Sequence, residues 1–358
     1  GLVRENGAFT IIKGEQGIEV NVEDSIAAIE NYISSEWDGG NAEIELVAEV
    51  VEPRGSEEDL EQITDMMGSY TTNYKDSGQN RCDNISNATS KINGTLLYPG
   101  EEFSVYEAIG PLDAANGYEL AGAYENGQTV ESYGGGVCQV STTLYNAVIL
   151  AELEITQRSN HSMIVSYVKP SMDAAIAGDY KDLRFVNNQD IPIYIEGYTE
   201  GKNVTFKIYG HDTRPSNRVV TYESEVVSEQ DPGTQYVATG DPAGYMKTAQ
   251  GKHIGYVARL WKVVTVDGVE ESREIFNKST YKASPKIVNV GTASADPNVS
   301  AVIGAALATG DEATINAAVA PYAASAAAIL NPAPVEQPSQ EEQAITGTVD
   351  ESQITGGE

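Results

Sequence analysis

The sequence predicts an α+β chain of several domains, and three observations support this fold class. Short β-like runs alternate with helical segments, glycine and proline mark frequent turns, and 358 residues with 41% hydrophobic content exceed one ordinary core. We expect an α+β module at residues 1–70, a main α+β domain at 71–215, a small elongated β module at 216–292 and an Ala/Pro/Glu-rich acidic tail at 293–358.

The first module carries four patterned segments: β-like runs at Phe9–Ile12 and Glu43–Val51, a helical pattern at Val22–Ile33, and a short acidic helix or linker at Glu57–Met67. Asn21 is expected to cap the first helix, because Asp24 follows it three residues later. Ile26, Ile29, Tyr32 and Ile33 are expected to share one face of that helix.

The main domain is expected to hold two helices and four strands. One helix covers Asn84–Asn93, and a stronger one begins near Cys138 after three glycines, with apolar residues at helical spacing: Val140, Leu144, Ala147, Val148 and Ala151. The strands are expected at Met163–Val168, Leu183–Val186, Ile191–Glu196 and Val204–Tyr209. Alternating β patterns continue from Val219 to Val290, and Ala313–Leu330 predicts only a weak helix.

The charge balance excludes one broad class of function. The chain has 22 Lys and Arg against 53 Asp and Glu, a formal charge of −31. Phosphate binding needs clustered basic residues, so no nucleic-acid partner is expected. The acidic residues are spread along the chain, which favours solubility and disfavours adhesion to anionic wall polymers by charge alone.

No membrane-spanning segment is expected, because the longest apolar runs, such as Ala301–Ala308 and Ala317–Leu330, are short, Ala-rich or interrupted. The sequence begins at Gly1 without a basic and then apolar leader, so any export signal or membrane anchor is expected upstream of it.

Metal and cofactor sites are also not expected. Two cysteines are too few for a Cys-rich zinc site, and the three histidines, His161, His211 and His253, form no HxxxH or HExxH spacing.

Cys138 is the sharpest candidate for chemistry. It follows Gly134, Gly135 and Gly136 and stands at the start of a predicted helix. Glycines let the backbone pass close to a substrate, and a helix N-terminus favours a thiolate. The alternative is that Cys138 is a small buried packing residue, which is the commoner fate of a single cysteine.

His161 and Asp173 are the candidate partners of this thiol. His161 follows Cys138 by 23 positions, and an imidazole within hydrogen-bond reach would take the thiol proton and later act as a general acid. Asp173 is the nearest candidate for orienting the imidazole, with Asp179 and Asp182 as rivals. Each of these residues has an ordinary alternative as a loop, turn or cap residue.

Residues around Cys138 and His161 are candidates for substrate or oxyanion contacts: Gly135, Gly136, Gln139, Ser141, Thr142 and Ser162. For the side chains in the first turn of the helix, ordinary capping is the competing role. Cys82 raises a separate alternative, since a Cys82–Cys138 disulfide would remove the nucleophile.

Several motifs, in order, resemble the VanW domain, over roughly residues 72–210: Lys91–Ser104, Asn116–Tyr118, Gly134–Ala147, His161–Ser162 and Asp173–Ala174. The preceding segment resembles, more weakly, a peptidoglycan-binding module that precedes VanW domains and the unrelated YkuD-type L,D-transpeptidase domains. The following segment is similar to a G5 domain, a glycine-marked β module of surface proteins linked to wall sugars.

These resemblances imply an extracytoplasmic protein of a Gram-positive cell envelope, with peptidoglycan stem peptides and glycan as partners. Some VanW-like proteins are understood to act as L,D-transpeptidases with a cysteine nucleophile, and Cys138 occupies the matching motif position. The chain has no SHGC-type signature of YkuD enzymes, so its chemistry would be a convergent solution on another fold.

Three functional hypotheses follow. The first is a cysteine-dependent L,D-transpeptidase forming 3-3 cross-links, with L,D-carboxypeptidase activity if water replaces the acceptor. The second is a non-catalytic scaffold that binds peptidoglycan, with Cys138 as a packing residue. The third is a thiol-independent peptidoglycan hydrolase, but no paired-carboxylate or metal-ligand motif supports it.

Overall fold

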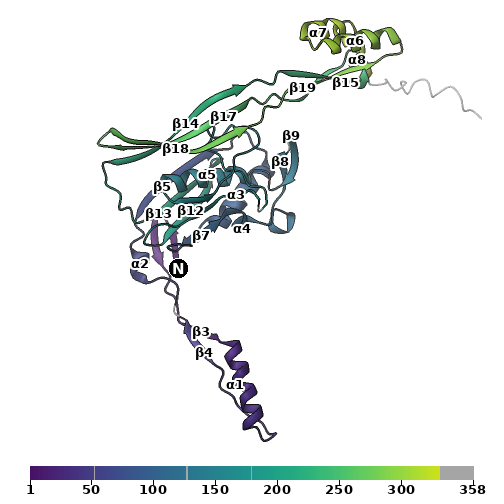
Figure 1. The fold of residues 1–358 in the computed structure, drawn as a ribbon. Helices are drawn as coiled ribbons and strands as arrows, with labels where there is room; N and C mark the ends of the chain where they lie inside the picture. The colour runs from purple at the N-terminus through teal and green to yellow at the C-terminus, as the bar shows by residue number, and fades with distance from the viewer. Residues whose placement is uncertain (52, 126–127, 179, 331–358) are drawn as a thin grey trace, which may run out of the picture. The chain divides into compact units, whose positions relative to one another are not determined.

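The computed structural model describes residues 1–330 except 52, 126–127 and 179 (Figure 1). The chain divides into two units, each described separately below. The first comprises residues 1–232 and 252–284, and the second comprises residues 233–251 together with the chain from 285 onward. The last part of the predicted tail, 331–358, lies outside the described residues.

An antiparallel sheet packed against two helices forms the centre of the first unit. Its four strands lie in the order β5 (Asp65–Asn73), β13 (Asn203–Gly210), β12 (Ile193–Glu200) and β6 (Thr95–Leu97). The helices are α3 (Gln79–Ile92) and α5 (Val137–Leu150). A smaller sheet orders β10 (Glu154–Gln157), β11 (Arg184–Val186) and β7 (Glu102–Ser104).

Shorter elements connect these parts. Helix α4 (Val105–Ile109) and the 3₁₀ turn η1 (Ala114–Asn116) follow β7. The hairpin of β8 (Leu120–Glu125) and β9 (Gln128–Tyr133) then leads directly into the glycines before α5.

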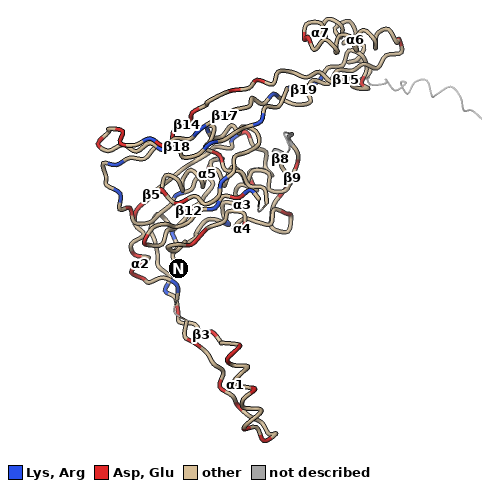
Figure 2. Tube along the Cα trace, viewed as in Figure 1, with Lys and Arg blue, Asp and Glu red and all other residues tan. Residues whose placement is uncertain are grey.

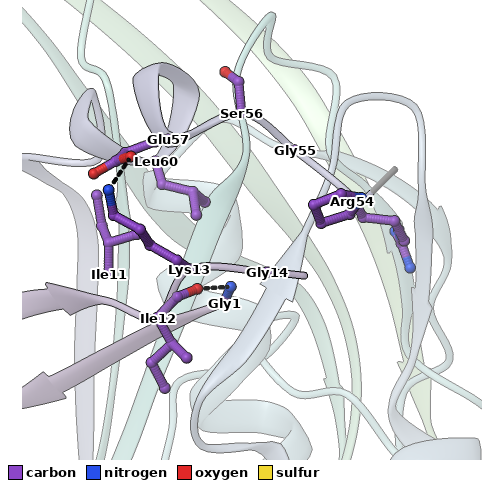
Figure 3. Close-up of a pocket in the computed structure, with 11 residues that line it drawn as sticks. Gly1, Ile11, Ile12, Lys13, Gly14, Arg54, Gly55, Ser56, Glu57 and Leu60 are labelled. Atoms are coloured by element: carbon purple, nitrogen blue, oxygen red, sulfur yellow. Dashed lines mark hydrogen bonds and ion pairs between the residues drawn. The ribbon is translucent and has the colours of Figure 1, made fainter. Parts of the chain in front are cut away.

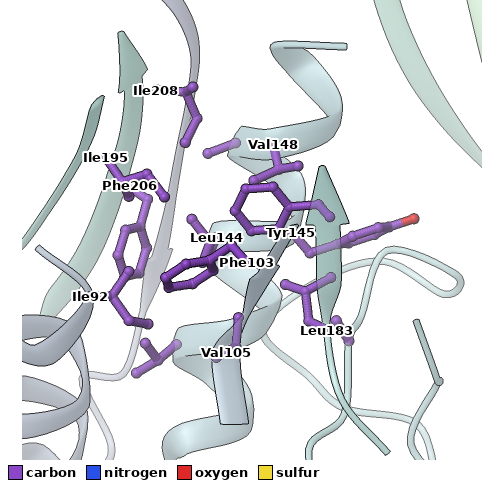
Figure 4. Packing of buried hydrophobic residues seen from close by; sticks show 14 of the residues in the cluster. Ile92, Phe103, Val105, Leu144, Tyr145, Val148, Leu183, Ile195, Phe206 and Ile208 are labelled. Atoms are coloured by element: carbon purple, nitrogen blue, oxygen red, sulfur yellow. The ribbon is translucent and has the colours of Figure 1, made fainter. Parts of the chain in front are cut away.

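Helix α5 is buried along most of its length, as its apolar spacing predicts. The five apolar residues expected on one face all lie in the main hydrophobic core: Val140, Leu144, Ala147, Val148 and Ala151. Figure 4 shows Leu144 and Val148 of α5 packing among Phe103, Phe206 and Ile208 from the surrounding strands. The core therefore fixes α5, and with it the position of Cys138.

The approach of β5 to α5 depends on a glycine. A Cβ atom at Gly68 would lie 2.2 Å from the backbone oxygen of Ala147 and 2.6 Å from the amide nitrogen of Ala151. Only a residue without a side chain lets the strand and the helix backbone approach this closely.

The N-terminal segment differs from the single module that the sequence predicts. The hairpin of β1 (Leu2–Glu5) and β2 (Ala8–Ile11) packs with Leu60 and Ile63 on Tyr194 and Tyr209 of the central sheet. Helix α2 (Glu57–Glu61) is shorter than expected, and residues 65–67, expected in a helix or linker, belong to β5. Because β5 pairs with β13, residues 65–70 of the predicted first module form part of the central sheet.

Helix α1 (Val22–Ser35) begins as expected, with the Asn21 side chain accepting a hydrogen bond from the Asp24 amide. The strand that follows is shorter than predicted, since only Ala48–Val51 (β4) pairs with β3 (Gly17–Val20). The expected apolar face of α1 is not buried in this structure: Ile26 and Ile33 are each about half exposed.

The segment that contains His161 also differs from prediction. No strand forms at Met163–Val168, and residues 158–176 run as an irregular loop over α5. Side chains of α5 satisfy polar backbone groups of this loop: Thr142 binds both the amide and the carbonyl of Ala174, and Asn146 donates to the carbonyl of Met172. These contacts replace the ladder that a strand would form.

The β module after residue 217 contains two three-stranded sheets, one in each unit. The sheet in the first unit orders β14 (Arg218–Gln230), β17 (Gly255–Val266) and β18 (Val269–Tyr281). It is attached to the central domain by Glu152, which accepts hydrogen bonds from Arg218 and forms an ion pair with Lys262. Tyr222 of β14 adds a hydrogen bond to the Ile149 carbonyl of α5.

The second unit contains a sheet and a helical segment. The sheet orders β15 (Thr234–Pro242), β19 (Lys286–Ala293) and β16 (Met246–Gln250). The predicted tail is partly folded, since residues 297–330 form α6 (Pro297–Thr309), α7 (Glu312–Val319), η2 (Ala320–Tyr322) and α8 (Ala323–Leu330). Ile303, Ile315 and Val319 are buried in one cluster with Val288 and Val290 of β19, which explains why this Ala-rich segment is ordered.

Within the described residues, the helical run Glu312–Leu330 is long and apolar enough to cross a membrane, by length and composition alone. This differs from the expectation that no segment qualifies. The run contains the 3₁₀ turn η2 with Pro321, and part of one face packs on β19.

Acidic residues are distributed over most elements of the described chain, and basic residues lie among them (Figure 2). This agrees with the spread expected from the sequence.

Replacing Gly68 with alanine should destabilise the first unit by about 3 kcal/mol, because the added methyl group overlaps the α5 backbone. Urea denaturation followed by tryptophan and tyrosine fluorescence measures the loss. Gly78→Ala is the matched control, since no atom lies within 4 Å of a Cβ there. Equal stability of the two variants would contradict the close approach.

Candidate active site

Cys138 lies in the first turn of α5, and the sequence around it explains how. The N-terminal cap of α5 is Gly136, whose φ of 114° is unfavourable for residues with a side chain. A Cβ at Gly136 would also lie 3.0 Å from side-chain atoms of Arg81 and Ile85. The cysteine is partly exposed, and its sulfur lies 3.4 Å from both the amide nitrogen and the carbonyl oxygen of Ile176.

His161 and Asp173 meet beside this thiol. The imidazole of His161 lies next to the Cys138 thiol, close enough for each group to shift the pKa of the other. On the other side, its Nδ1 lies 2.7 Å from Oδ2 of Asp173, and the His161 backbone amide donates to the same oxygen at 2.7 Å. His161 and Asp173 are both buried and Cys138 is half-buried, so the three side chains lie in series with the thiol at the less buried end.

Asp173 is held from several directions. Its Oδ1 accepts hydrogen bonds from Nη2 of Arg158, at 3.1 Å, and from the hydroxyl of Tyr281. Arg158 also donates through Nε to the Asp173 carbonyl. The carboxylate thus receives four donors, which offset the free-energy cost of burying its charge.

This arrangement shifts the pKa values of all three groups. Burial by itself raises the pKa of the Cys138 thiol, but the hydrogen bond and positive charge of His161 and the Ile176 amide lower it below the ordinary value. Burial by itself lowers the pKa of His161, but hydrogen bonds with Asp173 and Cys138 raise it to about 9. Burial raises the pKa of Asp173, while His161 and Arg158 outweigh it and keep the group ionised.

Chemically, both shifts favour proton transfer from the thiol to the imidazole, which gives a thiolate paired with an imidazolium ion. Such a pair can supply a nucleophile and, beside it, a donor that gives a proton to a leaving group. The Cys138 amide lies in the first turn of α5, where N–H groups lack acceptors within the helix and can bind an oxyanion.

The structure gives three of the predicted contact residues another role. Gln139 is buried and joins Thr72 and Asn73 of β5 to Arg81. Ser141 and Thr142 both donate to the Ala174 carbonyl. These side chains support β5 and the loop next to Asp173, and their polar atoms are engaged there instead of facing a substrate.

The backbone of Gly135, Gly136 and Ser162 lies around the site. A Cβ at Gly135 would lie 2.6 Å from the Ala121 carbonyl oxygen, so β8 packs directly on the glycine turn. The Ser162 carbonyl accepts a hydrogen bond from the Lys282 amide, just after β18. Gly136 is the helix cap described above.

The sequence also offered Asp179 and Asp182 as alternatives to Asp173, and a Cys82–Cys138 disulfide as an alternative to a free thiol. Asp182 is buried away from His161 and binds Ser104, Tyr106 and Leu183. Asp179 lies outside the described residues. Cys82 and Cys138 are both free thiols, and the Cys82 sulfur lies 3.7 Å from the Ser77 carbonyl oxygen, so the structure does not contain the alternative disulfide.

Sequence reasoning missed several residues around the three candidates. Arg158 lies three residues before His161, but nothing in its pattern showed that it would bind Asp173. Tyr167 packs edge-on to the His161 ring, with centroids 6.4 Å apart, and hydrogen-bonds to Thr142. Tyr281 is 108 positions from Asp173 in the chain, so only the fold brings the two together.

A separate pocket near the N-terminus contains none of these groups. Figure 3 shows it lined by residues such as Lys13, Arg54 and Ser56, with an ion pair of 3.0 Å between Lys13 and Glu57. No cysteine or histidine lines it among the described residues.

The fold and the site define a class: an α+β domain with a candidate Cys-His-Asp site, followed by a β module. Two family models match the chain, VanW like protein over residues 80–209 and G5 domain over residues 221–293. The chain is 32% identical over 208 residues to the uncharacterized protein YoaR of Bacillus subtilis (strain 168). These aligned residues make up 58% of this chain and 68% of YoaR. The chain belongs to the VanW-like family.

A second relative is the vancomycin B-type resistance protein VanW of Enterococcus faecalis (strain ATCC 700802 / V583). It is 30% identical over 118 residues, which are 31% of this chain and 42% of that protein. VanW-like and G5 domains are typical of extracellular, cell-wall-associated bacterial proteins.

Two solved G5 structures also match part of the chain. The IgA1 protease G5 domain is 24% identical, covering 22% of this chain and 94% of its own, with a TM-score of 0.15. The HP0197-G5 crystal structure is 14% identical, covering 21% and 100%, with a TM-score of 0.14.

Alkylation of Cys138 by iodoacetamide should reach half its maximal rate at a pH below about 8.5, the ordinary cysteine value, because His161 stabilises the thiolate. The measurement uses the Cys82→Ser protein, in which Cys138 is the single thiol. His161→Ala should move the midpoint upward. His211→Ala is the matched control, since His211 lies beside Asp65 in another part of the unit. A midpoint at or above 8.5 in the parent protein would refute thiolate activation.

Proposed function

We propose that this protein is a cysteine-dependent L,D-transpeptidase that forms 3-3 cross-links in peptidoglycan. The observation that carries the proposal is the placement of Cys138, His161 and Asp173 in series beside the start of α5, with a His161–Asp173 hydrogen bond and a thiol of lowered pKa. Membership of the VanW-like family and the G5 match support a role at the cell wall. We propose the envelope of a Gram-positive bacterium as its location.

The first half-reaction forms a thioester. The Cys138 thiolate attacks the carbonyl carbon that joins the third residue of a stem tetrapeptide to its terminal D-Ala. The amide C–N bond breaks, and the imidazolium of His161 gives its proton to the departing D-Ala amine. Asp173 holds the ring during this transfer, and the Cys138 amide binds the developing oxyanion.

The second half-reaction releases the product. The side-chain amine on the third residue of a neighbouring stem attacks the thioester, and neutral His161 takes its proton. An amide bond forms, the C–S bond breaks, and the thiolate–imidazolium pair is restored. Water in place of the amine gives a carboxylic acid, which is L,D-carboxypeptidase action.

The flanking modules are proposed to serve the same substrate. The N-terminal segment and the G5 module would contact glycan or stem peptides and hold the central domain within the wall. Because the chain carries a formal charge of −31, this binding would depend on specific contacts and not on charge attraction to anionic polymers.

Purified disaccharide-tetrapeptide incubated with the protein should yield dimers that have lost one D-Ala, detected by mass spectrometry. Cys138→Ala should yield none, because the acyl acceptor sulfur is absent. Cys82→Ser is the matched thiol control and should retain full activity, since Cys82 contacts the Ser77 carbonyl and not the site.

Other products would change the conclusion. Loss of D-Ala without dimers would indicate carboxypeptidase action by the same thiol. No change with the intact protein, on stems of both common third-residue types, would overturn the proposal in favour of the non-catalytic scaffold.

A further inference from the structure

Strand β18 lies against the loop that carries His161 and Asp173. It is the last strand of the β14–β17–β18 sheet, which is called the G5 sheet below because the G5 family model covers most of it. Asn160 donates to the Thr280 carbonyl at 2.9 Å, and the Lys282 amide donates to the Ser162 carbonyl at 2.7 Å. Arg158 donates to the buried Ser279 hydroxyl, also at 2.9 Å. Arg158, Asn160 and Ser162, which lie before or beside His161 in the loop, are thus hydrogen-bonded to residues 279–282 at the C-terminal end of β18.

Tyr281 makes the most direct of these contacts. Its hydroxyl donates to Oδ1 of Asp173 and accepts a hydrogen bond of 2.7 Å from the Ser171 amide. The side chain is 2% exposed. Burial raises the pKa of Tyr281 well above its ordinary value, so the phenol stays protonated and can serve as this donor.

The two oxygens of Asp173 therefore have different tasks. Oδ2 holds His161 through the ring nitrogen and the backbone amide, whereas Oδ1 is held by Arg158 and Tyr281. If Oδ1 loses a donor, the carboxylate gains freedom to rotate, and the imidazole loses its fixed orientation toward the thiol.

Ser279 and Asn277, also on β18, hold other residues around Asp173 in place. Ser279 orients Arg158, the second donor to Oδ1, and Asn277 donates to the Tyr145 hydroxyl at 2.7 Å and to the Ser171 carbonyl at 3.2 Å. The G5 strand thus contacts Asp173 directly through Tyr281 and indirectly through Arg158 and Ser171.

We infer that Tyr281 is a positioning residue for the candidate active site, so that the G5 module is a structural part of that site in addition to any role in wall binding. The inference rests on the proposed cysteine chemistry. It concerns how the thiol is activated, so it can be tested without peptidoglycan.

Tyr281→Phe in the Cys82→Ser protein tests this inference. The variant removes only the hydroxyl, which should loosen Asp173 and weaken the Cys138–His161 hydrogen bond. The midpoint of the iodoacetamide alkylation profile should rise by about half a pH unit or more. In the cross-linking assay kcat should fall about tenfold with KM changed less than about twofold, because substrate binding is untouched.

Tyr222→Phe is the matched control. Tyr222 lies on β14 of the same sheet, and its hydroxyl also bonds to the central domain, at the Ile149 carbonyl, 2.9 Å away and apart from Asp173. A purely structural role for both hydroxyls predicts similar losses of melting temperature and unchanged alkylation profiles. Equal profiles for Tyr281→Phe, Tyr222→Phe and the parent would overturn the inference.

Ser279→Ala replaces Tyr281→Phe if the latter does not melt cooperatively. It removes the hydroxyl that orients Arg158, and its profile should shift upward by a smaller amount, whereas no shift would count against the inference. A depressed parent midpoint that rises in Tyr281→Phe, together with no cross-linked product, would refute the proposed transpeptidase while leaving the positioning role intact.

Discussion

The buried carboxylate of Asp173 is the constraint on which the rest of the site depends. An ionised group at 1% exposure is costly unless donors surround it, and here the donors come from distant parts of the chain. His161 and Arg158 come from the loop after β10, and Tyr281 comes from the G5 sheet. The need to satisfy this one charge therefore brings together the loop and β18.

The thiol depends on a second constraint, which is steric. The glycine turn at Gly135 and Gly136 lets β8, α3 and the start of α5 approach to distances that a side chain would prevent. Core packing of α5 then fixes the Cys138 sulfur beside the Ile176 backbone. The sequence therefore supplies two rigid supports, a packed helix for the nucleophile and a hydrogen-bonded loop for the base.

Sequence patterns predicted the parts of this arrangement that depend on local order. Helical spacing indicated α5, the glycines indicated a close approach next to Cys138, and proximity in the chain suggested Asp173. The strand expected at Met163–Val168 was wrong: these residues lie in an irregular loop, whose later part, at Ala174, is bonded to α5 side chains such as Thr142. Tyr281 was not predictable, since no local pattern relates a tyrosine at a strand end to a carboxylate in another domain.

Because Tyr281 of β18 binds Asp173, the proposed chemistry depends on docking of the G5 sheet onto the central domain. Without β18, Asp173 would keep Arg158 and His161 but lose the Tyr281 donor, and Arg158 would lose the Ser279 hydroxyl that orients it. The free energy needed to bury the Asp173 carboxylate would then be higher in a central domain without the G5 sheet. Docking of the G5 sheet, which Glu152, Arg218 and Lys262 also stabilise, is in this view a condition for an ordered Cys138–His161–Asp173 series. Under the proposed function, the central domain and the β14–β17–β18 sheet act as one unit in holding the Asp173 carboxylate.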